Sequence, residues 1–240
     1  MIPTETPALE YQERLIAFID VLGFANLVEA SASDRPAREK VGKLIATNKL
    51  FDAFFTKLFD RAKTAFFSDS FVVSMEPQEI FYLVREIGFL CRYLLLLGLP
   101  CRGAITCGLL HHEGRIVVGP ALVHAYRLEQ SKARYPRVVL DDAAMNCWRA
   151  EFATEPAHAD CVTLVKTDQQ NTSYLDIFNS GWADSFIPWT EFIPSSDVIP
   201  VNVAEYLNTV RCRIGEGLAA STGDLKTHAK YEWLTTECPV

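Results

Sequence analysis

The first part of the chain carries an ordered series of hydrophobic patterns that predict strands and helices in alternation. Residues 15–22 are almost wholly apolar apart from Asp20, which predicts a buried central strand. Between 37 and 58 apolar residues recur every three or four positions, the period of an amphipathic helix. Two β-rich runs within 63–75 flank a polar segment at 68–70, a pattern typical of a hairpin.

A second long helix is predicted from Pro77 to about Leu97, because Gly98 follows it, and a further strand is predicted at 101–109. The order up to this point is strand, helix, strand, strand, helix, strand. This order predicts a ferredoxin-like core, an antiparallel sheet with helices on one face. In that topology the first strand lies centrally beside the third, and its end faces the hairpin.

The rest of the chain continues the alternation with weaker patterns. The expected elements are a turn at 111–114, strands at 115–119 and 136–141, helices at 119–130 and 141–152, a strand pair at 161–167 and 173–179, and helices at 203–218 and 224–233. No repeat or linker divides the chain. We therefore expect one α+β domain spanning 1–240, with a core at about 13–155 and a C-terminal extension at about 156–240.

Acidic residues outnumber basic ones, 30 to 23, which gives a formal net charge of −7. We therefore expect no nucleic-acid partner, and any phosphate ligand would need a metal ion or placed arginines. The apolar segment 80–99 carries Arg85, Glu86 and Arg92, so it predicts a buried helix rather than a membrane span. The start of the chain lacks signal-peptide features, and the cysteines lie mostly in apolar runs, so we expect a cytoplasmic protein.

The predicted topology brings two acidic residues together, Asp20 at the end of the first strand and Asp69 at the hairpin tip. A buried carboxylate is costly unless it is paired or bound to metal, so the two predict a site for one or two Mg²⁺ or Mn²⁺ ions. The turn at 21–24 would add backbone N–H groups that bind an anion, which suggests a nucleoside triphosphate. The alternative is that Asp20 only ends a strand and Asp69 only forms a turn.

Four motifs in this order resemble those of the class III nucleotidyl cyclases, over about residues 15–130. They are FIDVLGF at 18–24, FFSDSFVV at 66–73, CRGAITCG at 101–108 and GPALVHAYRLE at 119–129. The resemblance implies that Asp20, Asp69 and the backbone of Val21 hold two Mn²⁺ or Mg²⁺ ions. It also implies that the backbone of Val21, Leu22, Gly23 and Phe24 holds the β- and γ-phosphates.

In the same family an arginine at the position of Arg127 stabilises charge on the α-phosphate while pyrophosphate leaves. It acts on the site of the other protomer, so the resemblance implies a homodimer with shared active sites. In the tail, Lys226 and Lys230 lie on one helix face, and Lys230 is the stronger candidate for a triphosphate contact. The alternative for each of these residues is a solvated position on a helix surface.

Several positions depart from the family pattern. Val123 stands where many members have asparagine, and His124 could replace that side chain. The two positions that read a purine base are Ala65 and Ile116, so the purine-reading pair is missing. In this respect the chain resembles the bacterial pyrimidine cyclases of the Pycsar anti-phage systems, as do its segments AFIDVLGF and KYEWL.

The Pycsar resemblance implies synthesis of cyclic UMP or cyclic CMP, a second messenger that activates a separate effector during anti-phage defence. For the base pocket we expect bulk from Leu50 or Phe54, the small Ala65 and a contact from Arg102. A structural role for Arg102 is favoured over the base contact, because purine cyclases of the family also have an arginine in this strand. Two alternatives stay open. One is an adenylate or guanylate cyclase with an unusual base pocket, and the other is a degenerate, non-catalytic cyclase-fold domain.

Overall fold

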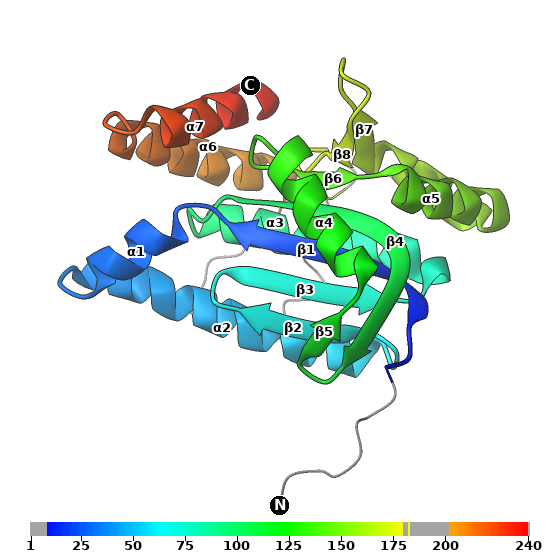
Figure 1. The fold of residues 1–240 in the computed structure, drawn as a ribbon. Helices are drawn as coiled ribbons and strands as arrows, with labels where there is room; N and C mark the ends of the chain where they lie inside the picture. The colour runs from blue at the N-terminus through cyan, green and yellow to red at the C-terminus, as the bar shows by residue number, and fades with distance from the viewer. Residues whose placement is uncertain (1–8, 180–181, 183–201, 240) are drawn as a thin grey trace, which may run out of the picture.

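The computed structural model describes residues 9–179, 182 and 202–239, which form one sheet with helices packed around it (Figure 1). Its first elements are β1 (Gln12–Val21), α1 (Phe24–Ser31), α2 (Arg35–Leu58), β2 (Lys63–Phe67), β3 (Ser70–Met75), the 3₁₀ helix η1 (Pro77–Glu79), α3 (Ile80–Leu96) and β4 (Cys101–Glu113). There follow β5 (Ile116–Val118), α4 (Pro120–Lys132), β6 (Val138–Leu140), α5 (Asp142–Thr154), the 3₁₀ helix η2 (Pro156–Leu164), β7 (Val165–Thr167), β8 (Ser173–Leu175), α6 (Val203–Ala220) and α7 (Leu225–Glu237).

The sheet order is β2-β3-β1-β4-β6-β8-β7, with β5 paired to β4. β1 runs antiparallel to its neighbours β3 and β4, whereas β4 and β6 are parallel. β1 to β4 with α2 and α3 therefore form the predicted ferredoxin-like core, inside a mixed sheet of eight strands. The α+β fold class predicted from the sequence is confirmed.

Helices begin where capping residues satisfy the first backbone N–H groups. Asp34 accepts a hydrogen bond from the Ala37 N–H, and Pro36 follows it in the first turn of α2. Asp141 accepts from the Ala144 N–H at the start of α5. These caps fix where α2 begins after α1 and where α5 leaves the sheet.

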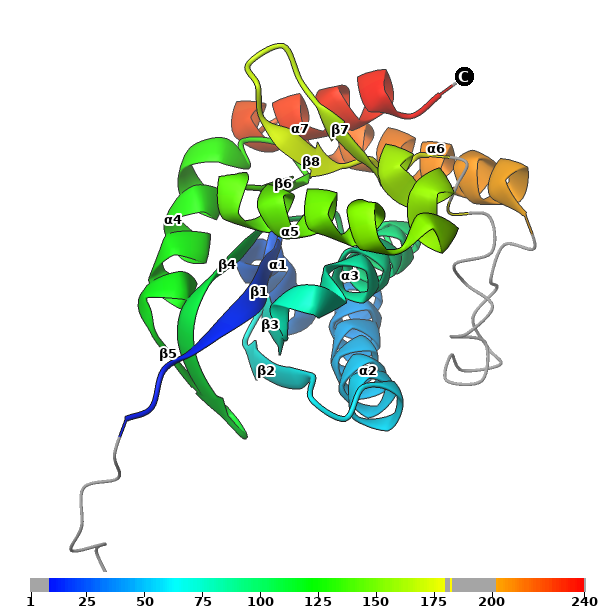
Figure 2. The same cartoon turned by 90° about the vertical axis from the view of Figure 1, so that its right-hand side faces the viewer.

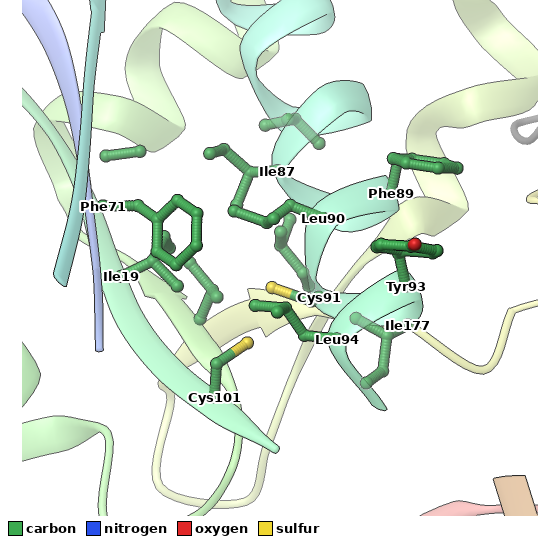
Figure 3. Close-up of a cluster of buried hydrophobic side chains, with 14 of the residues drawn as sticks. Ile19, Phe71, Ile87, Phe89, Leu90, Cys91, Tyr93, Leu94, Cys101 and Ile177 are labelled. Atoms are coloured by element: carbon green, nitrogen blue, oxygen red, sulfur yellow. The ribbon is translucent and has the colours of Figure 1, made fainter. Parts of the chain in front are cut away.

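The two faces of β1 are covered by different helices (Figure 2). Alternate residues, namely Leu15, Ala17, Ile19 and Val21, lie in the main core with α2 and α3. Figure 3 shows Ile19 and Phe71, from the sheet, facing Ile87, Leu90 and Leu94 of α3. The residues between them, such as Ile16 and Phe18, pack on α4. α4 thus covers the second face, which the order of the first six elements does not predict.

The C-terminal helices share the main core rather than forming a separate one. Tyr206, Val210 and Ile214 of α6 and Leu234 of α7 are buried in the same cluster as Leu15 and Ile19. None of the described helices is long and apolar enough to cross a membrane. As predicted, the apolar segment 80–99 includes a buried helix, α3, in which Glu86 and Arg92 are 1% exposed.

Several predicted boundaries were wrong, and the strand predicted at 173–179 ends at Leu175. β4 continues through His111 and His112, because these residues pair with Val118 and Val117 of β5, so the turn is at Gly114. The predicted strand at 161–167 begins only at 165, because Val165–Thr167 is the part that pairs with β8, and 161–164 belong to η2.

Candidate functional site

Two adjacent strands bring Asp20 and Asp69 to the same edge of the sheet. Asp20 is paired with Ser70 of β3 and with Arg102 of β4. The N–H of Val21 donates to the carbonyl of Asp69 at 3.1 Å, which fixes the hairpin tip against the end of β1. Because Asp20 alternates with the core residues of β1, its side chain lies on the face covered by α4.

The carboxylate of Asp20 is in an unfavourable electrostatic position. Burial raises its pKa, the negative charge of Asp69 raises the pKa further, and Arg102 only partly offsets both. Two carboxylates that repel each other at a partly buried position would be stabilised by a cation between them. This is the observation on which a metal-ion hypothesis rests.

Arg102 lies between two carboxylates from different elements. Its Nε is 3.5 Å from Oδ2 of Asp20, and the same atom contacts Glu129 of α4, whose side chain is fully buried. Burial raises the pKa of Glu129, and Arg102 lowers it. Nε of the guanidinium is thus engaged by these acids, which favours the structural role of Arg102, and its contact with a base stays a prediction.

Glu129 is a site residue that the sequence analysis missed. It follows Arg127 at the end of the GPALVHAYRLE segment and lies one helical turn after Ala125, which is also buried. That spacing places Glu129 on the inner face of α4. An acidic residue on a predicted buried helix face was the available signal, because such a residue needs a charged partner.

The β1–α1 turn offers fewer backbone N–H groups to an anion than the sequence predicted. Gly23 has a φ of 76°, in the left-handed region that favours glycine, and it precedes the first turn of α1. The N–H groups of Val21 and Leu22 already donate to the carbonyls of Asp69 and Pro100, at 3.1 and 2.9 Å. Of the expected segment, only Gly23 and Phe24 therefore offer N–H groups, together with the rest of the first helical turn.

Lys230 of α7 lies where the sequence analysis expected it, near this turn. It lines a cavity of about 380 Å³ together with Leu22 and Gly23. Burial lowers its pKa, as does the charge of Arg102, while Asp224, Asp20 and Glu129 raise it. Lys226, in contrast, is exposed, and its backbone N–H joins the Asp224 cap of α7.

Arg127 is exposed on the outer side of α4, next to Val123 and Tyr126, which are 47% and 51% exposed. Within the described chain its guanidinium makes no ion pair with an acidic side chain. His124, which could have replaced the family's asparagine, lies 2.9 Å from Oδ2 of Asp141 through its Nε2. His124 is therefore tied to the cap of α5.

The expected base-pocket residues lie on different sides of the sheet. Leu50 and Phe54 are buried in the main core with α3, on the face opposite to Asp20, so the base contact expected of them is corrected. Ala65 is buried on the α4 face, paired with Val72, the same face as Asp20. Ile116 on β5 is 64% exposed.

A divalent cation fits the donor set at this edge of the sheet. Asp20 and Asp69 offer carboxylate oxygens and Val21 offers a backbone carbonyl, which are the hard ligands that Mg²⁺ and Mn²⁺ prefer. Among the described residues no three His, Cys, Asp or Glu side chains form a metal cluster. Mg²⁺ is often held by one or two carboxylates, with water and substrate phosphates completing its coordination, and this donor set has that form.

No protein-family model matches the chain, and no curated protein matches it. Solved structures similar to it include a bacterial light-regulated adenylyl cyclase, at 15% identity and a TM-score of 0.45, covering 58% of this chain. The chain spans 46% of that protein's length. Another is the adenylyl cyclase CyaB from P. aeruginosa, at 16% identity and a TM-score of 0.47, covering 59% of this chain and 84% of that one. A third is the catalytic core of a rhodopsin-guanylyl cyclase with converted specificity in complex with ATPalphaS. It is 13% identical, with a TM-score of 0.48, and the match covers 69% of this chain and 96% of that one. Likeness at this level concerns the fold and identifies no substrate.

Proposed function

We propose that the chain is a metal-dependent nucleotide cyclase that converts a pyrimidine nucleoside triphosphate, UTP or CTP, into its 3′,5′-cyclic monophosphate and pyrophosphate. The observation that carries this proposal is the meeting of Asp20 and Asp69 beside the Gly23 turn. Their mutual repulsion favours cation binding, and the N–H groups next to them favour phosphate binding. A carboxylate with a purely structural role would not require a second carboxylate and free N–H groups beside it.

The reaction requires a bond from the ribose 3′ oxygen to the α-phosphorus and cleavage of the bond to the bridging oxygen. Pyrophosphate leaves with that electron pair, and the hydroxyl proton passes to water or to pyrophosphate. A bound divalent ion supplies charge neutralisation on the phosphates. In this proposal Asp20 and Asp69 hold that ion, and the N–H groups of Gly23 and Phe24 orient the phosphates.

Arg127 serves the site of a second copy of the chain in this proposal. Glu129, two residues further along α4, contacts Arg102 beside Asp20. Positions two apart on a helix point in nearly opposite directions, so Arg127 points away from the Asp20 of its own chain. An exposed arginine without an acidic partner suits a head-to-tail homodimer with two shared sites, in which it stabilises charge on the α-phosphate.

The pyrimidine preference rests on Ala65 and Ile116. Ala65 lies on the Asp20 face of the sheet, where a base would bind, and neither residue offers a hydrogen bond to a purine. An adenylate or guanylate cyclase would have to read its base through other residues. The Pycsar resemblance supports a second messenger, cyclic UMP or cyclic CMP, that acts through a separate effector in anti-phage defence.

A non-catalytic nucleotide-binding domain is the second candidate, and Val123 favours it. An exposed valine there offers no hydrogen bond to the ribose or to the reacting phosphate. Retention of Asp20, Asp69 and Arg127 favours the enzyme.

Product formation separates the two candidates. The purified protein is incubated with each pyrimidine triphosphate and Mn²⁺, and pyrophosphate and cyclic nucleotide are measured. We expect both products in equal amounts, and neither when EDTA is added or in Asp20→Asn. Triphosphate binding without release of pyrophosphate would instead establish the non-catalytic domain.

A further inference from the structure

The cavity beside Lys230 is enclosed by parts of the chain that are far apart in the sequence. The β1–α1 turn, the first half of α2, the loop between α3 and β4 and the α6–α7 hairpin all contribute to its walls. In Figure 1 the α6–α7 hairpin lies on the same side of the molecule as α1. The volume of about 380 Å³ is in the range of roughly 300–1,000 Å³ that is usual for small-molecule sites.

This cavity adjoins the candidate metal site, because Leu22 and Gly23, which follow Asp20 in the β1–α1 turn, line it. Lys230 interacts electrostatically with Asp20 while it lines the cavity. A ligand held at the Gly23 turn therefore borders the cavity. Because the proposed function places phosphates at this turn, we take the terminal phosphate end as the part of the nucleotide that lies next to the cavity.

The cavity walls carry positive charge in a chain whose overall charge is negative. Lys40, Arg213 and Lys230 line it, together with two acids, Glu216 and Asp224. Both acids are already engaged within the chain. Glu216 lies 2.9 Å from Arg213 in an ion pair, and Asp224 accepts hydrogen bonds from the first turn of α7.

Lys40, like Lys230, makes no ion pair with an acidic side chain in the described chain. It is half-buried on α2 and directed at Gly98, where a Cβ atom would be 3.2 Å from its Nζ. Gly98 has a φ of 70°, so glycine is favoured there by its backbone as well. An unpaired lysine beside a cavity is available for an anionic ligand.

We propose that this cavity binds the pyrophosphate end of the nucleotide and that Lys40 is a phosphate-binding residue, acting together with Lys230. The inference rests on the proposed function and extends it. It gives the C-terminal hairpin a role, because α6 and α7 supply the wall that holds Lys230 near the leaving group. When the bond to the bridging oxygen breaks, the electron pair stays on pyrophosphate, and both ammonium groups stabilise the added charge.

The test measures binding rather than turnover. Calorimetry with the full chain in Mg²⁺ is used to compare inorganic pyrophosphate, a non-hydrolysable pyrimidine triphosphate and a pyrimidine nucleoside monophosphate. We expect Lys40→Gln to weaken binding of the first two by about tenfold and to leave the monophosphate unchanged, since a charge-assisted hydrogen bond is lost. Lys40→Arg should retain most of the affinity.

The matched control is Lys49→Gln, an exposed position on the same helix that does not line the cavity, and it should bind like the wild type. Equal pyrophosphate affinity in Lys40→Gln and wild type would overturn the inference, as would an equal loss of monophosphate binding. The proposed function can fail separately. Pyrophosphate binding that depends on Lys40, without any cyclic product, would retain this site and reject the cyclase.

Discussion

Two polar clusters lie on the α4 face of β1, at its two ends, and they are built differently. At one end Arg14 is 4% exposed and donates to Oγ of Ser74 at 3.1 Å and to the carbonyl of Arg61 at 2.7 Å. Oγ of Ser74 is 2.7 Å from Nδ1 of His112. At the other end the negative charge of Asp69 raises the pKa of Asp20.

The two clusters differ in whether their buried polar residues are satisfied by neighbouring groups, and this difference indicates their roles. Arg14 donates to a hydroxyl and to backbone carbonyls, and it therefore ties strands together. Asp20 retains repulsion that its neighbours only partly offset, and the turn that follows it, at Leu22 and Gly23, lines a cavity. We infer that the Arg14 cluster serves stability and the Asp20 cluster serves ligand binding. Each of the following predictions tests that division.

Neutralising the acidic end should have the largest effect. Asp20→Asn and Asp69→Asn should each reduce cyclisation by a factor on the order of 10³ or more, because the cation ligands are lost. Thermal unfolding should show no loss of stability, since each substitution removes one of two carboxylates that repel each other. Full turnover in either variant would remove the metal assignment.

Arg127→Ala should reduce turnover roughly 10²-fold, because the charge opposite the α-phosphate is lost. Separately purified Asp20→Ala and Arg127→Ala proteins should regain about a quarter of the wild-type activity when mixed, since half of the dimers hold one intact site. The mixture is assayed after equilibration of the subunits. If it stays as inactive as its two components, the shared-site dimer is wrong.

At the other end, Arg14→Met should act on stability instead. Loss of its hydrogen bonds to Ser74 and Arg61 should lower the free energy of unfolding by about 2–4 kcal/mol. Chemical denaturation measures this change, and turnover per folded molecule should stay unaltered. Arg35→Met, in an exposed pair with Glu39 on α2, is the control and should change stability by less than about 0.5 kcal/mol.

The smallest effect concerns pH and His112. Burial lowers the pKa of His112 from 6.5 to about 4, as do the charges of Lys63 and Arg14. Below pH 6.5 the unfolded chain therefore binds a proton that the folded chain does not, and stability falls as the pH drops toward 4. Above pH 6.5 this contribution is constant.

Denaturation at pH 7 and at pH 4.5 measures this loss. We expect His112 to account for roughly 2 kcal/mol of it, so the fall should be smaller in His112→Gln by that amount. A pH dependence that is the same in both proteins would show that His112 is protonated in the folded chain.

The sequence predicted the meeting of Asp20 and Asp69 because it depends on strand order and on a hairpin tip, both of which leave local patterns. The role of Glu129 could not be derived in the same way. Its contact with Arg102 exists only because α4 packs on the second face of β1, which is a tertiary event. The apolar spacing of Leu50 and Phe54 correctly predicts burial, but it does not identify which face of the sheet they cover.

The proposed phosphate site also depends on tertiary contacts that the sequence does not predict. The glycine of the β1–α1 turn was visible in the sequence, whereas the use of two of its N–H groups by Asp69 and Pro100 depends on strand register. The cavity with Lys40 requires α2 to lie near the C-terminal hairpin. No local pattern records that contact.

The most direct test of the central claim is a competition among the four nucleoside triphosphates. An equal mixture of ATP, GTP, UTP and CTP is incubated with the protein and Mn²⁺, and cyclic products are identified by mass spectrometry. We predict that cyclic UMP or cyclic CMP is the dominant product and disappears in Asp20→Asn. Dominant cyclic AMP or cyclic GMP would contradict the pyrimidine assignment, and the absence of all four products would contradict the cyclase itself.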